Sequence, residues 1–283
     1  MKKKTERAKD FLAENDCLFR CPICYLELNV ATNGLACPSN HHFELSKKGT
    51  LFFLKKAVKT EYDREMFIPR GRMIASGMYA PILEKIRQEL DMDKTTLDVG
   101  CGEGSFLHEL TKLGLNGIKL GFDISKDGIY EATNQPLYED TFWCIADLTN
   151  LPFADESIDQ ILNIFTPSAY NEFERVLKPR GKLIKIIPEE NYLKELRQAF
   201  YPNDNKKQEY SNEKVLQKLE SQLKIRTNER VQYTFDIPEK NRVDLLEMSP
   251  LEWGVDKSVK EQLQKDPLKT ITIDVRIIVG SFD

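Results

Sequence analysis

The sequence predicts an α/β fold with a mainly parallel sheet, preceded by a small N-terminal domain. Between residues 95 and 187, short apolar runs alternate with helix-like stretches, and such alternation requires crossover connections between parallel strands. Ahead of this region, four of the six cysteines lie within the first 37 residues. We therefore expect three parts: residues 1–59 as a cysteine-rich module, 60–93 as a linker and helix, and 94–283 as the main domain.

The composition is that of a folded chain. Hydrophobic residues make up 41% of the 283 residues and charged residues 30%, which is enough apolar material for a packed core and excludes a disordered chain. No apolar run approaches the ~20 residues that cross a bilayer. The N-terminal lysines are not followed by the apolar stretch of a secretory signal. We expect a soluble, cytoplasmic protein without a membrane partner.

Charge is spread unevenly along the chain. The net charge is −4, yet residues 1–89 hold 16 lysines and arginines against 11 acidic residues, whereas residues 90–283 hold 25 against 34. A basic N-terminal part joined to an acidic remainder indicates that the N-terminal part binds a polyanion. An asymmetry of this size also arises by chance, so charge alone does not decide between the two interpretations.

The N-terminal cysteines are spaced as metal ligands. Cys21 and Cys24 form a Cys-x-x-Cys knuckle, and a second knuckle runs from Cys37 to His41. Asn33–Gly34 between them is a hairpin turn signal that would bring the two knuckles together. Three sulfurs and one imidazole nitrogen are a tetrahedral set preferred by structural zinc. All four positions are filled by protein, so we expect a structural ion with no open position for catalysis.

Neighbouring side chains leave alternatives within this ligand set. Cys17 competes with Cys21, and His42 competes with His41, although only His41 keeps the second spacing tight. Disulfides are disfavoured in a chain without an export signal, and a redox Cys-x-x-Cys would sit at a strand-to-helix junction of a larger domain. Residues 49–54 are expected to close the ribbon as a strand. The positive rim of this module consists of Lys47, Lys48, Lys55, Lys56 and Lys59.

A glycine-rich loop opens the main domain. A short apolar strand ends at Asp98, glycines follow at 100, 102 and 104, and an apolar-periodic helix continues to Leu113. Glycine suits a backbone that passes close to a ligand, and the helix N-terminus beyond it offers unpaired N–H donors. The dinucleotide fingerprint has the spacing Gly-x-Gly-x-x-Gly. The tighter spacing here indicates a ligand without a pyrophosphate.

Acidic residues recur where the following strands end. A strand over 117–123 ends at Asp123, and a strand over 142–147 ends at Asp147. Each acid alone has an ordinary explanation as a helix cap or a solvated loop residue, but three at successive strand ends behind a glycine loop point to one site. The remaining expected elements are strands at 160–165 and 182–187, a helix at 168–177, and an antiparallel edge-type strand at 271–279 that pairs with 230–236.

This arrangement resembles class I S-adenosylmethionine-dependent methyltransferases. The resemblance implies a Rossmann-like fold with a mainly parallel seven-stranded sheet. It also implies that Asp123 accepts hydrogen bonds from both ribose hydroxyls of the cofactor and that Asp147 contacts the adenine.

Four blocks in this order resemble the bacterial 23S rRNA (guanine-N1)-methyltransferase family. They are the zinc knuckles, Arg70/Arg72 with Gly77-x-Tyr79-x-Pro81, the loop 98–104, and Leu245–Trp253. The match spans nearly the whole chain and is weakest over 195–235. Family members methylate a guanine in a domain II hairpin of large-subunit rRNA beside the peptide exit tunnel. Two subgroups modify different nearby guanines, and in one of them the mark influences macrolide sensitivity.

The resemblance assigns residues to roles. It implies one structural Zn²⁺ on Cys21, Cys24, Cys37 and His41. It implies cofactor contacts by Tyr79, Asp98, Gly100, Cys101, Gly102, Gly104, Ser105, Phe106, Asp123, Asp147 and Tyr192. Tyr192 is a departure, since some relatives are expected to have histidine there. For RNA contacts we predict Lys47, Lys48, Lys55, Lys56, Arg70 and Arg72. Homodimerisation is compatible with gripping a hairpin from two sides.

The acceptor chemistry leaves alternatives open. Guanine N1 carries a proton at neutral pH, yet the acceptor segment 163–167 contains no obvious base, so we assign no catalytic residue. Phe165 and Tyr170 could stack an unpaired base or could simply belong to the core. A small-molecule methyltransferase of the quinone type would share the glycine loop but leave the zinc module unexplained. A zinc-ribbon RNA-binding or resistance protein without turnover is the third interpretation.

Overall fold

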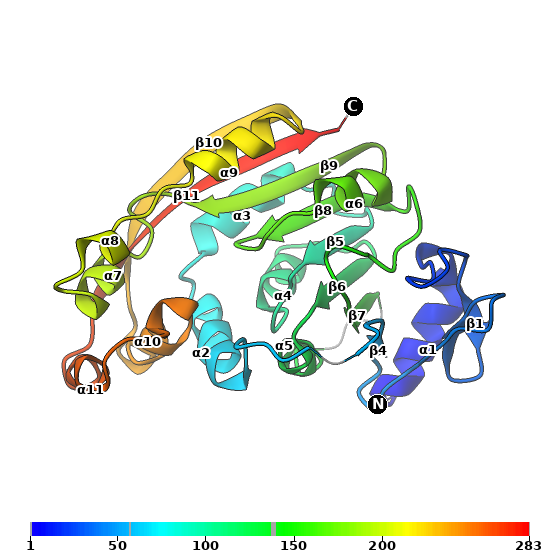
Figure 1. Cartoon of the computed structure of the whole chain (residues 1–283), viewed down its shortest axis with the longest axis horizontal. Coiled ribbons are helices and arrows are strands. Elements are labelled where there is room, and N and C mark those ends of the chain that lie inside the picture. Colours follow the sequence, from blue (N-terminus) through cyan, green and yellow to red (C-terminus); the bar gives the residue numbers. More distant parts are fainter. Residues whose placement is uncertain (1, 57, 137–139, 283) are drawn as a thin grey trace.

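The computed structural model describes residues 2–56, 58–136 and 140–282. Within these residues a single large sheet of eight strands organises the molecule, in the order β10-β11-β9-β8-β5-β6-β7-β4 (Figure 1). The strands are β4 (Leu51–Phe52), β5 (Thr96–Val99), β6 (Lys119–Asp123), β7 (Thr141–Ile145), β8 (Ile158–Ile164), β9 (Leu177–Pro188), β10 (Lys224–Asp236) and β11 (Thr270–Ser281).

The six strands from β4 to β9 run parallel, and β11 and β10 complete the sheet in antiparallel pairing. The predicted mainly parallel sheet is therefore confirmed, but within the described residues it has eight strands instead of the expected seven, because β4 of the N-terminal segment joins its edge. The predicted pairing of 230–236 with 271–279 is also confirmed, with Val231 opposite Val275. However, β11 is not an edge strand, since it lies between β10 and β9. Its burial on both faces explains why its apolar residues run almost without interruption.

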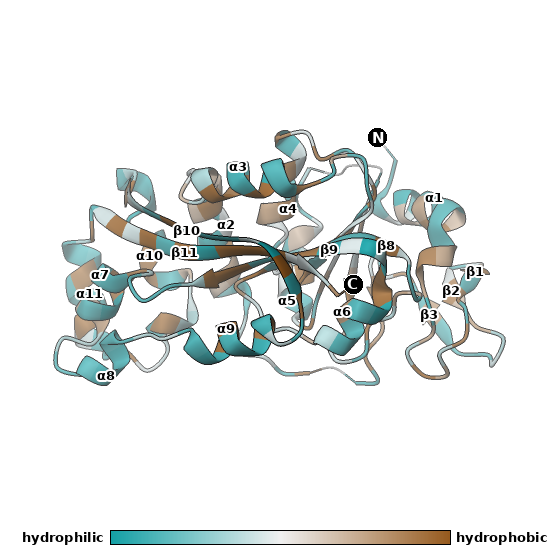
Figure 2. Cartoon of the chain, turned by 90° about the horizontal axis from the view of Figure 1, so that it is seen from above, coloured by the Kyte–Doolittle hydropathy of each residue, from teal (hydrophilic) through white to brown (hydrophobic). Residues whose placement is uncertain are grey.

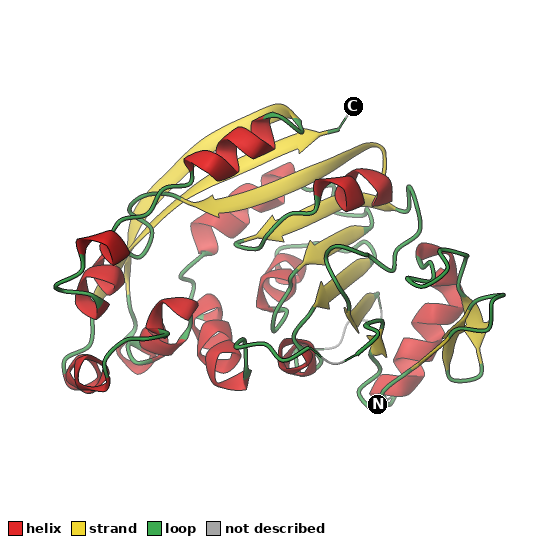
Figure 3. Cartoon of the chain, viewed as in Figure 1, coloured by secondary structure: helices red, strands yellow, loops and turns green. Residues whose placement is uncertain are grey.

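Helices cover both faces of the sheet (Figure 3). They are α1 (Lys4–Asn15), α2 (Arg64–Ala75), α3 (Ala80–Glu89), α4 (Ser105–Lys112), α5 (Lys126–Ala132), α6 (Tyr170–Val176), α7 (Lys194–Phe200), α8 (Asn205–Gln208), α9 (Glu213–Glu220), α10 (Asp244–Glu247) and α11 (Lys257–Lys265). One core cluster includes side chains of α1, α6 and α9, and the other includes side chains of α3, α4 and α5. Apolar residues follow the inner strands, while α8 and α9 present polar surfaces (Figure 2).

A separate small sheet forms the N-terminal ribbon. It contains β1 (Asn29–Ala31), β2 (Gly34–Ala36) and β3 (His42–Glu44), paired antiparallel in that order. The predicted hairpin is confirmed, because Ala31 pairs with Gly34 across the turn. None of the helices in the described part of the chain has both the length and the apolar character that crossing a bilayer requires.

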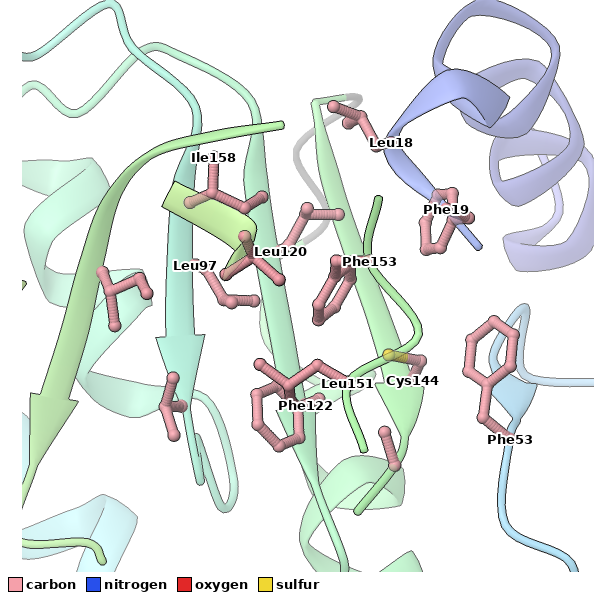
Figure 4. Packing of buried hydrophobic residues seen from close by; sticks show 14 of the residues in the cluster. Leu18, Phe19, Phe53, Leu97, Leu120, Phe122, Cys144, Leu151, Phe153 and Ile158 are labelled. Atoms are coloured by element: carbon pink, nitrogen blue, oxygen red, sulfur yellow. The ribbon is translucent and has the colours of Figure 1, made fainter. Parts of the chain in front are cut away.

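The ribbon segment continues into the main sheet. Residues 49–54 were expected to close the ribbon, but β4 pairs parallel with β7, so that Leu51 lies opposite Cys144. The N-terminal helix α1, which the sequence analysis did not identify, also packs on β7 through Phe11, whose ring stacks on Phe142 at 5.2 Å. Figure 4 shows Phe19 and Phe53 of the N-terminal segment beside side chains of the main domain. Side chains of the N-terminal segment and of the main domain therefore share one core cluster, and the expected boundary near residue 59 stays a prediction.

Candidate functional site

The four predicted metal ligands lie together. One ligand atom from each of Cys21, Cys24, Cys37 and His41 falls within 4.8 Å of the others. The Nδ1 atom of His41 is 3.3 Å from the Cys37 sulfur and 3.5 Å from the Cys21 sulfur, and the sulfurs of Cys24 and Cys37 are 3.5 Å apart. A tetrahedron around Zn²⁺ with bonds of ~2.3 Å has edges of ~3.7 Å. The donor set and its spacing therefore fit a closed structural zinc site.

Backbone geometry selects these four side chains over their neighbours. Tyr25 and Asn40 each adopt a positive φ, 63° and 62°, which bends both knuckles tightly around the ligand cluster. Cys17 is exposed and outside the cluster, and His42 is bonded to Asn40 at 2.8 Å. The N–H of Leu26 lowers the pKa of the Cys24 thiol to about 6, which favours the thiolate that a metal binds.

The metal-ligand segment is bonded to the turn that follows β7. The side-chain amide of Asn150 donates to the carbonyl of Pro22 at 2.8 Å, and the N–H of Arg20 donates to Pro152 at 3.0 Å. Phe19 and Phe153 form an isolated bridge beside these bonds. The first knuckle is therefore fixed to the loop that begins at Asp147.

The glycine loop between β5 and α4 needs glycine for two physical reasons. Gly100 and Gly104 have φ values of +64° and +73°, in the left-handed region. A Cβ on Gly100 would come within 2.4 Å of the Thr166 hydroxyl, and one on Gly104 within 2.6 Å of the Trp143 ring. Gly102 donates its N–H to the Asp123 carboxylate at 2.9 Å, which ties the loop to the end of β6.

A cavity of about 570 Å³ opens at the carboxyl ends of β5, β6, β7 and β8. Ligands of doubly wound α/β folds bind at this edge, where the strand order reverses. Its walls include five of the predicted cofactor residues: Tyr79, Gly100, Asp123, Asp147 and Tyr192.

The other six predicted cofactor residues lie outside the cavity lining. They are Asp98, Cys101, Gly102, Gly104, Ser105 and Phe106. Gly102 is covered by α2, because a Cβ on this glycine would meet the Phe67 ring and the Arg70 guanidinium. Phe106 packs behind Tyr79 at 5.3 Å between ring centroids. These residues shape the loop from behind, and their direct contact with a cofactor stays a prediction.

The strand-end acids are held by backbone donors. Asp123 accepts from the N–H groups of Gly102 and Ser125, at 2.9 and 2.7 Å. Burial raises its pKa, and these two N–H groups oppose the rise. The Asp147 carboxylate accepts from the N–H and the hydroxyl of Thr149 at 2.8 and 2.7 Å. These bonds to the residue two positions later close a tight turn. Each carboxylate retains acceptor capacity for a hydroxyl or amine of a ligand.

Aromatic side chains form the wall opposite the acids. The hydroxyls of Tyr79 and Tyr192 share a hydrogen bond of 2.6 Å, and Phe165 stacks on Tyr192 with 5.1 Å between centroids. Burial raises the pKa of Tyr79 to about 12, so its hydroxyl stays protonated at neutral pH. Of the two side chains considered for base stacking, Phe165 lines the cavity, whereas Tyr170 belongs to the core.

Asp98 is buried without a full set of partners. Its Oδ2 atom makes no hydrogen bond within the described residues, and burial raises its pKa to about 8. A cation placed near this carboxylate by a ligand would offset that cost.

A pH-dependent stability difference is expected for Asp98→Asn. Between about pH 4 and pH 8 the folded wild-type protein holds a proton on Asp98 that the unfolded chain releases, so this group makes stability fall as pH rises. The melting temperature of the variant, relative to that of wild type, should therefore increase from about pH 5.5 to pH 8. Thermal unfolding at three pH values measures this difference, and a difference that is constant with pH would contradict the assignment.

Several wall residues were not identified from the sequence. Tyr62 from the linker, Met66 and Phe67 from α2, and the segment Met248–Leu251 all line the cavity. Tyr62 and Leu251 come from segments far apart in the chain, so no local pattern marks them. The block Leu245–Trp253 was identified only through its resemblance to the methyltransferase family. That resemblance is the signal that could have assigned this block to the cavity wall.

The predicted RNA-contact residues have varied positions. Arg70 lines the cavity, with its guanidinium 3.6 Å from the Glu103 carboxylate. Burial alone would lower the Arg70 pKa, but the charge of Glu103 outweighs this effect, so the pKa is raised overall. Arg72 is half-exposed and pairs with Asp244, which pins α2 to α10. Lys47, Lys55 and Lys56 are exposed, and Lys48 lies over the Tyr130 ring at 4.8 Å. Their role in RNA binding stays a prediction.

Comparison with known proteins identifies relatives of both parts of the chain. Residues 19–54 match the zinc-ribbon family described as RlmA, N-terminal, and residues 90–242 match the family described as methyltransferase domain. YxjB of Bacillus subtilis (strain 168), assigned as a 23S rRNA (guanine-N1)-methyltransferase, is 37% identical over 93% of this chain and 96% of its own length. The 23S rRNA (guanine(748)-N1)-methyltransferase of Streptomyces fradiae is 27% identical over 64% of this chain and 67% of its own.

Solved structures agree on the fold. A chain of the complex between the Haloferax volcanii Trm112 methyltransferase activator and a methyltransferase superposes with a TM-score of 0.52 and 18% identity, covering 80% of this chain and 99% of that one. The methyltransferase domain uses S-adenosylmethionine as its methyl donor, and the ribbon carries a structural zinc ion. The chain therefore belongs to the bacterial 23S rRNA (guanine-N1)-methyltransferase family.

Proposed function

We propose that this protein transfers a methyl group from S-adenosylmethionine to N1 of a guanine in 23S rRNA, in a domain II hairpin near the peptide exit tunnel. The observation that carries the proposal is the bond between Asn150 and Pro22, which fixes the zinc knuckle to the rim of the cofactor cavity. An RNA held by the basic N-terminal segment would thus lie beside the methyl donor. Such a substrate is made in the cytoplasm, where the sequence also predicts the protein.

The cavity residues bind and orient the donor. S-adenosylmethionine supplies, when bound, an electrophilic methyl group on a sulfonium. Asp123 is placed to accept from the ribose hydroxyls, because its two oxygens are already aimed by the N–H groups of Gly102 and Ser125. The turn at Asp147 and Leu148 borders the adenine end. A positive charge brought to the glycine loop would oppose the raised pKa of Asp98 and favour its carboxylate form.

The aromatic wall serves the acceptor. Methyl transfer is an in-line displacement, so most of the catalytic gain comes from alignment, which supplies roughly 7–11 kcal/mol when reactants are well oriented. Phe165 and Tyr192 form a stacked pair in the cavity wall, and an unstacked base can pack on such a surface. Tyr79 and Tyr192, the predicted cofactor contacts, are bonded to each other at 2.6 Å through their hydroxyls and so present one wall to both the cofactor and that base.

The N-terminal lysines extend the RNA-binding surface. Lys47, Lys55 and Lys56 are exposed on the segment that joins the ribbon to the main domain. Contacts to phosphate release counterions, so RNA affinity should fall steeply with rising salt. The same surface could be shared between two copies of the chain on one hairpin, which is how we interpret the predicted homodimer.

Methyl transfer to unmodified rRNA tests the proposed function. The zinc-loaded full chain, tritiated S-adenosylmethionine and 23S rRNA transcribed without modifications should give label in RNA, and nucleoside analysis should identify 1-methylguanine. Primer extension would locate the product, because a methyl on N1 blocks base pairing. rRNA methylated beforehand by the same enzyme is the matched control and should accept no further label.

Three other outcomes would overturn the proposal. Label in a small quinone-type acceptor but not in RNA would favour the small-molecule interpretation. Tight S-adenosylmethionine binding with RNA binding but without transfer would favour a protein that has lost turnover. A methylated product other than 1-methylguanine would refute the assigned acceptor atom.

A further inference from the structure

A lysine is buried beneath the loop that forms the acceptor side of the cavity. Lys185 lies in the middle of β9 and is only 3% exposed. It sits opposite Asn163 in the neighbouring strand β8. Its ammonium donates to the Asn163 side-chain oxygen, to the Thr166 carbonyl at 3.2 Å and to the Ser168 hydroxyl at 2.8 Å. Its three N–H groups are therefore matched by three oxygens around one loop.

Two of the side chains that accept from Lys185, Asn163 and Ser168, are also bonded to each other. The Asn163 side-chain amide donates to the Pro167 carbonyl at 2.9 Å, and the Ser168 hydroxyl donates to the Asn163 side-chain oxygen at 3.0 Å. These bonds close residues 163–168 into a ring around the ammonium. We call this arrangement the acceptor-loop clamp.

The clamp holds a strained residue. Phe165 has a φ of +56°, a left-handed conformation that is strained for a residue with a Cβ. Such a conformation persists only where the surrounding structure determines it. Here Asn163, two residues before Phe165, and the three residues after Phe165 are all fixed by the bonds of the clamp.

The strained conformation has a direct effect on the cavity. It lets the Phe165 ring stack on Tyr192, at 5.1 Å and an interplanar angle of 29°, and approach Tyr79 at 5.6 Å. It also places Thr166 against Gly100 of the glycine loop. One loop thus touches both the donor side and the acceptor side of the cavity.

A purely structural filler would not need to be a lysine. All three acceptors of Lys185 are uncharged, and burying an ammonium is costly even when it is hydrogen-bonded. Burial lowers its pKa to about 8, in line with that cost. A methionine would fill the same space without the cost, but it could not gather three oxygens at one point.

We propose that Lys185 is a positioning residue for methyl transfer, which fixes the 163–168 loop so that Phe165 and Thr166 hold the acceptor base in line with the donor. This inference rests on the proposed function. It goes beyond that function because it assigns alignment of the acceptor to a side chain that does not itself line the cavity.

Lys185→Met and Lys182→Met are the matched test pair. Lys182 lies on the same strand and pairs with Asp91 at 2.8 Å, far from the clamp. Steady-state kinetics with 23S rRNA, calorimetric titration with S-adenosylmethionine and thermal unfolding are measured for both. A small misplacement of reacting groups can cost about 100-fold in rate. We therefore expect kcat of Lys185→Met to fall by about 30-fold, with the S-adenosylmethionine Kd changed by less than about threefold. Lys182→Met should match wild type.

Ser168→Ala is a second test variant, which keeps the proposal testable if Lys185→Met does not fold. It removes one oxygen of the clamp and should lower kcat by a few-fold, again with little change in cofactor Kd. Hydrogen exchange of both clamp variants should increase at the amides of residues 163–166 and 168 and not elsewhere. This measurement needs no RNA, so it distinguishes failure of the clamp from failure of the proposed function.

The outcomes separate cleanly. Unchanged kcat and unchanged exchange in the loop would overturn the positioning role. A parallel loss of kcat, cofactor affinity and melting temperature in both clamp variants would show a merely structural role and would also overturn it. If wild type itself transfers no methyl to rRNA, the proposed function fails, whereas unchanged exchange at the loop in the clamp variants would show that the clamp itself fails.

Discussion

Replacing Cys24 by serine is expected to lower the melting temperature of the whole chain, in a single transition. The metal-ligand segment shares a core with the main domain, since Phe19 packs against Phe142 and Phe153 at 5.7 and 5.8 Å between centroids. Structural zinc contributes directly to folding free energy. A loss of only about 4 kcal/mol in a domain of this size lowers the melting temperature by about 10 °C, and we expect at least that.

Loss of the metal is also expected to weaken cofactor binding. The Asn150–Pro22 bond holds the turn that begins at Asp147, so a disordered knuckle releases one wall of the cavity. A hydrogen bond contributes about 1 kcal/mol, which corresponds to a Kd for S-adenosylmethionine raised by about fivefold. Calorimetric titration below the melting temperature measures this change, and a chelator added to wild type should reproduce it.

Cys17→Ser is the control for this prediction. Cys17 is an exposed cysteine outside the ligand cluster, so its replacement should leave both melting temperature and cofactor affinity at wild-type values. A Cys24→Ser protein that melts in two steps, with the main domain and its cofactor affinity unaffected, would show instead that the module folds independently, as the sequence alone suggests.

The second large effect is expected from Asp123→Ala. The carboxylate accepts the N–H groups of Gly102 and Ser125 and lines the cavity, so the substitution removes a ribose acceptor and leaves both donors without it. Hydrogen bonds to charged groups contribute about 1.5–3 kcal/mol each. The Kd for S-adenosylmethionine should rise about 100-fold, measured by calorimetric titration.

Asp127→Ala provides the matched control. Asp127 lies four residues further on, exposed in the first turn of α5 and outside the cavity lining. It should change cofactor affinity by less than about twofold, since exposed charges contribute little. An equal loss of affinity in both variants would mean that the ribose contact lies elsewhere.

The sequence predicted the cofactor edge because its signals are local. A glycine loop and an acid at the end of each following strand are read from short stretches, and parallel strands bring their carboxyl ends to one edge. Asp123 and Asp147 therefore meet Gly100 at the same cavity. The metal ligands were predicted for the same reason, since each knuckle spans only four or five residues.

Long-range partners were not predictable in this way. Leu51 and Phe52 are equally apolar whether they close the ribbon or join β7, so their pattern does not distinguish the two. Arg70 was predicted as an RNA contact, and no local pattern indicated that the packing of α2 would bring it to Glu103. Its role in RNA binding stays a prediction. Lys185 could have been noticed from the sequence, because it is a charged residue inside an apolar strand. The strand was predicted without drawing a conclusion from this lysine.

The pairing of β4 with β7 has a consequence for the solubility of shortened forms. A chain cut at the start of the linker would leave β7 as a bare edge, with unpaired N–H and C=O groups beside exposed aromatic surface once covered by Phe11 and Phe19. Such edges recruit strands from other molecules. By covering this edge, the N-terminal segment thus protects the chain from self-association. This role is separate from any contact with RNA.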